Sequence, residues 1–155
     1  MHAGLILVAA LVSVPGAGVK DACQLLTIEE VAKAANAGPL AIDPQTSGET
    51  DNGGSSCTWQ PKGQAPAVIL TVENGARPGG TAAARFAASK IETFGGGRTQ
   101  PAAVPGLGDE ALYRDFDNGK GGALLVRRGN DIVTFSGSAR RDVYVALARL
   151  VLQRL

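Results

Sequence analysis

Residues 110–136 read EALYRDFDNGKGGALLVRRGNDIVTFS, and this stretch decides the fold. Its apolar side chains recur with a period close to two, which predicts three consecutive strands at 110–116, 122–128 and 131–136. The connections are Asp117-Asn118-Gly119 and Gly129-Asn130, and these residue types favour tight turns. Strands joined by such short turns run antiparallel, so the stretch predicts three strands of an antiparallel sheet.

Two more strands are predicted upstream, at 56–60 and 67–73. The second reads AVILTVE and is rich in β-branched residues, and the segment between the two, PKGQ, favours a hairpin. The stretch from 42 to 56 is polar and rich in turn residues, so we expect an exposed loop there.

Helical signals predict three helices, at 28–36, 81–94 and 139–155. Thr27 and Glu30 have the spacing of a capping box at the start of the first helix. Ser138 is the expected N-cap of the third. The second helix presents one stripe at helical spacing, made of Ala83, Phe86, Ala87, Lys90, Ile91 and Phe94.

In chain order these elements are a helix, two strands, a helix, three strands and a helix. The order predicts the α+β class, as a single domain over residues 20–155. An antiparallel sheet of about five strands packs there against three helices.

The first nineteen residues have the features of a signal peptide. Residues 5–14, LILVAALVSV, are almost wholly apolar, and a Pro-Gly-Ala-Gly segment follows them. An apolar run of about ten residues suits a signal peptide and is too short for a membrane span of about 20. We therefore expect residues 1–19 to be removed, leaving a periplasmic or secreted protein without a transmembrane span. The alternative is a buried N-terminal strand or helix.

The chain has two cysteines, Cys23 and Cys57. In an exported protein a disulfide between them is expected, whereas two buried thiols are the alternative. Lys20 and Asp21 stand where a lipobox needs small aliphatic residues, so lipid attachment to Cys23 is not expected. Trp59 follows Cys57 by two residues, and we expect it to pack over the disulfide. A ligand-stacking role is the alternative for Trp59.

The composition argues against several classes of function. The net charge of +1 and the aromatic content of 5% do not favour a nucleic-acid partner. The sole histidine, His2, lies in the predicted signal peptide. Without it, neither a Ser-His-Asp triad nor a His-containing zinc site is available. We therefore expect a non-enzymatic protein without metal or cofactor.

Two arginine pairs, Arg127-Arg128 and Arg140-Arg141, raise the question of an anion site. The predicted strands separate the pairs by about 20 Å, at 3.3 Å per residue. The second pair lies instead at the end of the sheet that carries Asp115 and Asp117. Local ion pairing is the favoured interpretation. Ligand or partner contacts remain candidate roles for Trp59, Tyr113, Arg140 and Arg141.

Three short motifs together resemble a known group of proteins. They are DACQLLTIEEV at 21–31, SCTW at 56–59 and VPGLGDEA at 104–111, followed by Tyr113. The combination resembles small exported bacterial proteins of uncharacterised domain families, many of them lipoproteins or periplasmic proteins and some PsbP-like in fold. This resemblance implies an envelope location and a binding role, and it carries over no functional residues.

Together these observations predict an exported, non-enzymatic binding or protein-interaction module of the bacterial cell envelope. One alternative is an inhibitor of a secreted enzyme that presents the loop at 46–55. The other is a hydrolase that uses carboxylates.

Overall fold

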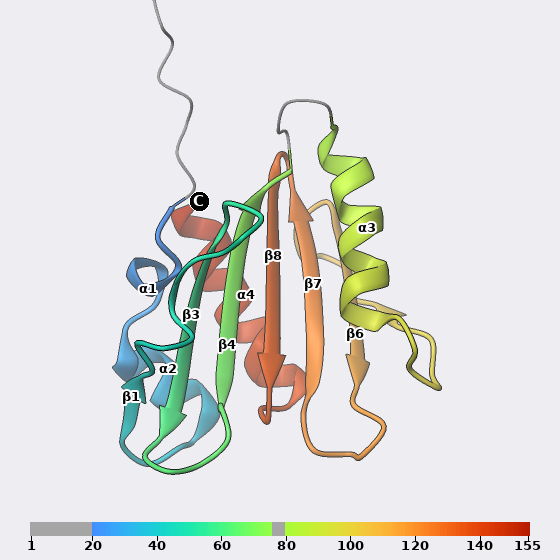
Figure 1. Ribbon diagram of the computed structural model, residues 1–155. Helices are drawn as coiled ribbons and strands as arrows, with labels where there is room; N and C mark the ends of the chain where they lie inside the picture. Colours follow the sequence, from blue (N-terminus) through green and yellow to red (C-terminus); the bar gives the residue numbers. More distant parts are fainter. Residues whose placement is uncertain (1–19, 76–79) are drawn as a thin grey trace, which may run out of the picture.

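A computed structural model describes residues 20–75 and 80–155 of the chain (Figure 1). Within these residues eight strands form one antiparallel sheet in the order β1-β3-β4-β8-β7-β6-β5, and β2 also pairs with β3. The strands are β1 (Leu40–Ile42), β2 (Gly48–Glu49), β3 (Ser55–Pro61), β4 (Val68–Asn74), β5 (Ala102–Ala103), β6 (Glu110–Asp115), β7 (Gly122–Arg128) and β8 (Asp131–Gly137). The helices are α1 (Ala22–Leu25), α2 (Ile28–Ala35), α3 (Ala82–Phe94) and α4 (Arg141–Arg154).

The α+β class and the antiparallel sheet are confirmed, but the predicted five strands and three helices are too few. The prediction missed α1 and the short strands β1, β2 and β5. These strands contain only two or three residues each, and β2 lies inside the segment expected to be a loop. A run of two or three residues is too short to show an alternating side-chain pattern. Backbone pairing with β3 and β6 holds these short strands in the sheet. The predicted signal peptide lies outside the described residues.

The pairing of β4 with β8 lies in the middle of the sheet. It sets Leu70 opposite Phe135 and Thr71 opposite Thr134. On the β4 side of it lie β3, β1 and β2, and on the β8 side lie β7, β6 and β5. The two halves of the chain are thereby joined into one sheet.

Helices cover both faces of the sheet unequally. On one face α1, α2 and α4 bury the larger core, and Figure 1 shows α4 behind the central strands. On the other face α3 lies over β7 and β8 and covers a smaller core. The largest fully buried side chains include Trp59, Tyr144 and Phe135.

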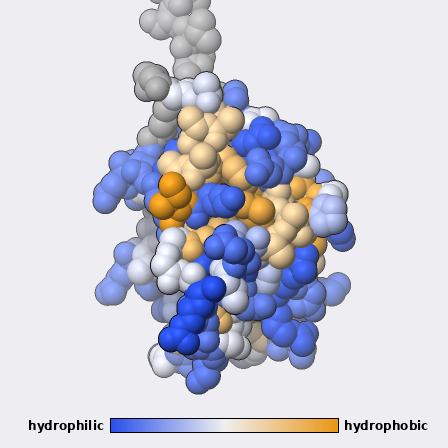
Figure 2. All heavy atoms as spheres, turned by 90° about the vertical axis from the view of Figure 1, so that its right-hand side faces the viewer, coloured by the Kyte–Doolittle hydropathy of each residue, from blue (hydrophilic) through white to orange (hydrophobic). Residues whose placement is uncertain are grey.

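The rotation of α3 differs from the prediction. Its buried residues are Phe86, Ser89 and Phe94, whereas Ile91 is 73% exposed. The predicted stripe through Ala83, Ala87, Lys90 and Ile91 is therefore mostly at the surface, and Figure 2 shows apolar residues among hydrophilic ones on this side. In this orientation the helix also directs Arg85 towards the sheet. Its Nε lies 2.7 Å from a carboxylate oxygen of Glu73 on β4.

The start of α4 also differs from the prediction. The helix begins at Arg141 with Arg140 as N-cap, and no side chain caps it. Ser138 is not the N-cap, because the helix starts three residues after it; the Ser138 and Ala139 amides donate to the Pro66 and Ala67 carbonyls. The chain thus continues along the start of β4 for two residues beyond β8 before it turns into the helix.

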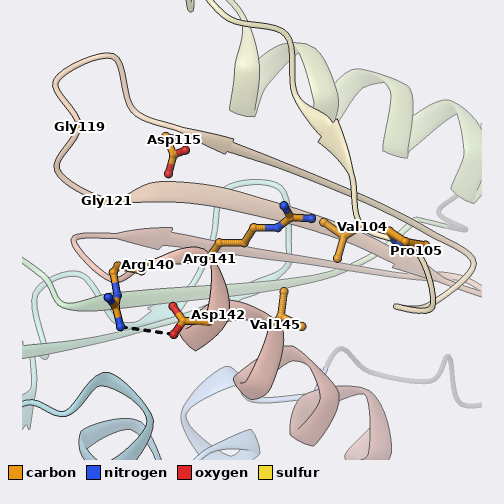
Figure 3. Close-up of a pocket in the computed structure, with 9 residues that line it drawn as sticks. All are labelled: Val104, Pro105, Asp115, Gly119, Gly121, Arg140, Arg141, Asp142 and Val145. Carbon is orange, nitrogen blue, oxygen red and sulfur yellow. Dashed lines mark hydrogen bonds and ion pairs between the residues drawn. The ribbon is translucent and has the colours of Figure 1, made fainter.

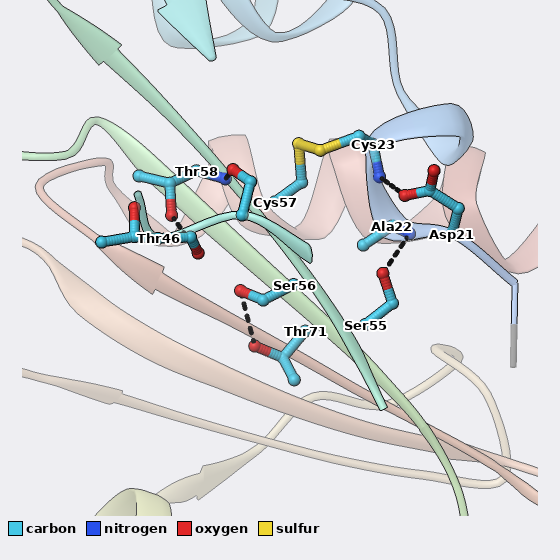
Figure 4. Close-up of a disulfide and its surroundings, with 10 residues drawn as sticks. Asp21, Ala22, Cys23, Thr46, Ser55, Ser56, Cys57, Thr58 and Thr71 are labelled. Atoms are coloured by element: carbon cyan, nitrogen blue, oxygen red, sulfur yellow. Dashed lines mark hydrogen bonds between the residues drawn. A yellow bond between two sulfur atoms is a disulfide. The ribbon is translucent and has the colours of Figure 1, made fainter. Parts of the chain in front are cut away.

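The disulfide between Cys23 and Cys57 is present, with a Cα–Cα distance of 5.0 Å (Figure 4). It joins α1 to β3. The same junction is held by the Ala22 amide, which donates to Ser55 Oγ at 2.9 Å, while Asp21 caps the Cys23 amide at 2.9 Å. Cys57 is fully buried, as is Trp59 two residues further along the same face.

The predicted capping box at the start of α2 is confirmed and also binds α4. Thr27 and Glu30 exchange both expected hydrogen bonds. The Glu30 carboxylate accepts two further bonds from the Arg154 guanidinium, at 2.6 and 2.9 Å, and Arg154 also donates to the Leu25 carbonyl. At the same end of the molecule Lys20 Nζ donates to the Leu155 carbonyl at 3.1 Å.

Removal of the disulfide by the double substitution Cys23→Ala and Cys57→Ala is expected to lower the free energy of unfolding by about 4 kcal/mol. This figure follows from the chain-entropy cost of closing a loop between two residues 34 positions apart in the sequence. Chemical denaturation of the parent and variant measures it. Equal stability of the two proteins, or alkylation of both cysteines in the unreduced native protein, would contradict the expectation.

Acid is expected to weaken the contact between α2 and α4. Hydrogen bonds from Arg154, and then from Thr27, lower the pKa of Glu30 from 4.5 to about 2. A lowered carboxyl pKa stabilises the fold above the unfolded pKa near 4.5, and this contribution is lost as the pH falls towards 2.

Because the pair is partly exposed, we expect Arg154→Gln to cost about 1 kcal/mol at neutral pH, and less as the pH approaches 2. Arg149→Gln, an exposed position on the same helix, is the control. Denaturation curves at neutral and acid pH provide the measurement. A loss that does not change with pH would contradict the role of Glu30.

Candidate functional site

A cavity of about 720 Å³ lies between the start of α4, the end of β5 and the β6–β7 turn (Figure 3). We call it the hairpin cavity. Its lining consists of Val104, Pro105, Asp115, Gly119, Gly121, Arg140, Arg141, Asp142 and Val145. A second cavity, of about 500 Å³, adjoins it and shares Asp115, Gly119 and Arg141.

Glycine allows the β6–β7 turn to approach the start of α4. Gly121 has a φ of +92°, and a Cβ there would lie 1.9 Å from the Gly137 carbonyl oxygen at the end of β8. A side chain at Gly122 would lie 2.4 Å from the Tyr113 hydroxyl oxygen. A larger residue at Gly121 would push the turn away from the end of β8, and one at Gly122 would displace Tyr113 or the adjoining backbone of β6.

Tyr113, on β6, lines the adjoining cavity and lies beside Arg141 of α4. The residue is 4% exposed, and its hydroxyl donates to Asp115 Oδ1 at 2.6 Å. Burial, and then the bond to Asp115, raises its pKa. The Arg141 guanidinium carbon lies 5.7 Å from the centre of the Tyr113 ring, within the range of a cation–π contact.

The cavity contains equal numbers of cationic and acidic side chains, but their hydrogen bonding differs. Asp115 accepts from Tyr113, and Asp142 accepts from Arg140 at 3.4 Å. Within the described residues the Arg141 guanidinium has neither an ion pair nor a hydrogen-bond acceptor. Figure 3 shows this side chain extending from α4 across the cavity towards Val104. The site therefore offers donors from Arg141, together with apolar surface from Val104, Pro105 and Val145.

Three of the four candidate contact residues come together here. Tyr113 lies beside Arg141, and Arg140 lines the same cavity. The fourth, Trp59, is fully buried in the core next to the disulfide-bearing Cys57. It has no surface that a ligand could reach in this conformation.

The two arginine pairs lie at opposite ends of the sheet, as the strand pattern predicts. In the strand register Arg128 lies opposite Asp131 at the β7–β8 turn. Gly122, where β7 begins, lies at the other end of that strand. Local ion pairing is found for Arg127, which contacts Asp109 at 3.2 Å. Arg140 likewise contacts Asp142, but Arg141 does not follow this interpretation.

Sequence reasoning did not identify Val104, Asp142 and Val145 as site residues. Val104 comes from the turn before β6, and its amide donates to the Ala111 carbonyl, which brings that turn to the sheet edge. The other two lie in the first turns of α4, which begins at Arg141, later than predicted. Neither an alternating nor a helical sequence pattern indicates that the turn before β6 and the start of α4 meet at one cavity.

Within residues 20–75 and 80–155 no three potential metal-ligating side chains gather. In the same part of the chain every helix is too short or too polar to reach across a bilayer. Comparison with protein-family models finds no match to the chain, and comparison with curated proteins finds none either.

Both tyrosines are expected to resist ionisation while the protein is folded. Burial is the main cause that raises the pKa of Tyr113 and of Tyr144. A raised tyrosine pKa stabilises the fold below the unfolded value of about 10, and this contribution is lost as the pH rises above it.

We expect almost no tyrosinate absorbance from the folded protein at about pH 11, whereas the denatured chain ionises near pH 10. Ultraviolet titration in parallel with circular dichroism separates ionisation from unfolding. Full ionisation of one tyrosine near pH 10 with the dichroism unchanged would contradict the burial of that ring.

Proposed function

We propose that this protein is an exported, non-enzymatic binding domain of the bacterial cell envelope, and that it binds its ligand in the hairpin cavity. The observation that carries the proposal is the cavity itself. It combines apolar walls with the Arg141 side chain, which has no acceptor among the described residues. Binding sites commonly have this composition, a mostly apolar recess with a few polar groups that orient the ligand.

The disulfide supports the exported location. Disulfides form and persist in oxidising compartments such as the periplasm and the extracellular space. The Cys23–Cys57 bond links the first helix to a core strand across a sequence separation of 34 residues. A reducing compartment would remove this link.

Two alternatives keep specific structural support. The loop around β2 is exposed and fixed, because Ser47 Oγ accepts from the Thr58 amide and Asp43 accepts from the Gln45 amide. A fixed exposed loop is what an inhibitor of a secreted enzyme would present. For a carboxylate hydrolase, Asp115 and Asp142 are two acids that line the hairpin cavity.

Filling the cavity is expected to abolish ligand binding without unfolding the protein. Val145 is partly exposed and points into the cavity (Figure 3), so Val145→Trp should occupy the space. The matched control is Ala146→Trp, at the next and exposed position of α4. The oxidised domain is used to capture ligands from envelope extract, and mass spectrometry identifies small molecules and proteins bound to each form.

We expect the parent and Ala146→Trp to retain the same ligand and Val145→Trp to lose it. Equal retention by all three proteins would place the site elsewhere, and a loop substitution such as Glu49→Ala would then test the inhibitor alternative. Turnover of ester or glycoside substrates that is lost in Asp142→Asn would favour the hydrolase instead.

A further inference from the structure

The charged groups of the hairpin cavity differ in whether they have a hydrogen-bonding partner in the protein. Each of its two carboxylates accepts a hydrogen bond, from Tyr113 and from Arg140 respectively. In the adjoining cavity the Asp117 carboxylate accepts from the Arg98 amide at 3.3 Å. The guanidinium groups of Arg98 and Arg141 have no acceptor within the described residues. The charged groups without any hydrogen-bonding partner in the described residues are therefore cationic donors, which can pair with an anion.

The position of Arg141 favours a ligand at one place in the cavity. Its guanidinium is held over the Tyr113 ring, which limits the conformations of a long side chain before any ligand binds. A guanidinium group presents donors in a planar fork that matches the two oxygens of a carboxylate. Val104, Pro105 and Val145 lie around the same space and offer apolar contact.

The number of negative charges on the ligand is limited by the cavity. Its lining carries two arginines and two aspartates, so its formal charge is balanced. A single negative charge can pair with Arg141. A second one would face Asp115 and Asp142 at close range, where like charges repel.

We propose that the hairpin cavity binds a monoanionic carboxylate with a short apolar body, the carboxylate pairing with Arg141 and the apolar part lying on Val104, Pro105 and Val145. This inference rests on the proposed function and specifies its ligand. A free organic acid and the C-terminal carboxylate of a peptide have the same chemistry, so the test includes both.

Titration followed by amide chemical shifts tests the proposal. The probes are hexanoate with its neutral analogue hexanamide, and acetylated alanyl-leucine with either a free or an amidated C-terminus. Inorganic phosphate serves as the more highly charged anion. Arg141→Gln is the test variant. Arg149→Gln is its matched control, because Arg149 lies on the same helix, is exposed and is outside the cavity lining.

We expect the carboxylate probes to shift the Val145 amide and to bind about tenfold or more tightly than their neutral analogues, the scale of a charged hydrogen bond. Arg141→Gln should remove this preference, and Arg149→Gln should preserve it. If hexanoate alone binds, the ligand is a free acid, and if the peptide binds more tightly, it is a chain terminus.

Three results would overturn the proposal: neutral probes that bind as tightly as acids, a preference that survives in Arg141→Gln, or phosphate that binds more tightly than the carboxylates. In each case shifts at Val145 would still support the cavity as the binding site. If no probe shifts Val145 and envelope capture is insensitive to Val145→Trp, the proposed function fails as well.

Discussion

The antiparallel pairing of β4 with β8 is the contact on which the rest of the molecule depends. It joins a disulfide-linked N-terminal half to a C-terminal meander. The pairing continues beyond β8, because the Ser138 and Ala139 amides donate to the chain just before β4. Gly137 permits this approach, since a Cβ there would lie 2.7 Å from the Ala67 carbonyl oxygen. The end of this pairing determines where α4 begins, and hence where Arg141 enters the hairpin cavity.

Local patterns predicted the elements that local interactions form. The three strands of the meander carry both alternation and turn residues, and the capping box at Thr27 and Glu30 is complete within four residues. The partner of β4 could not be predicted in the same way, because strands with suitable patterns do not specify which distant strand they join. The start of α4 was misplaced for that reason: Ser138 has the chemistry of an N-cap, but residues 138 and 139 still pair with the chain before β4, and the helix starts after them. The stripe on α3 was only partly right: Phe86 and Phe94 are buried, whereas Ile91 is exposed and Arg85, outside the stripe, pairs with Glu73.

In the candidate site, too, local sequence indicated the residues, but long-range contacts determined their arrangement. Tyr113 and the two arginines were identified from their residue types, but their proximity depends on two glycines and on the late start of α4. Trp59 was expected to pack next to the disulfide, and it does lie in the core, because its strand face is covered by the helices of the larger core; its alternative ligand role is not supported. Residue chemistry therefore indicated candidates, while long-range packing selected which of them meet at a surface.

The two ends of α4 contact different parts of the molecule. At one end Arg141 enters the cavity, and at the other Arg154 is bonded to Glu30, beside the contact of Lys20 with Leu155. A helix of fourteen residues separates these points by roughly 20 Å. Both ends of the described domain therefore emerge together on the side away from the cavity. An affinity handle, a surface linker or a fluorescent reporter joined at either end would leave the cavity facing outward and accessible.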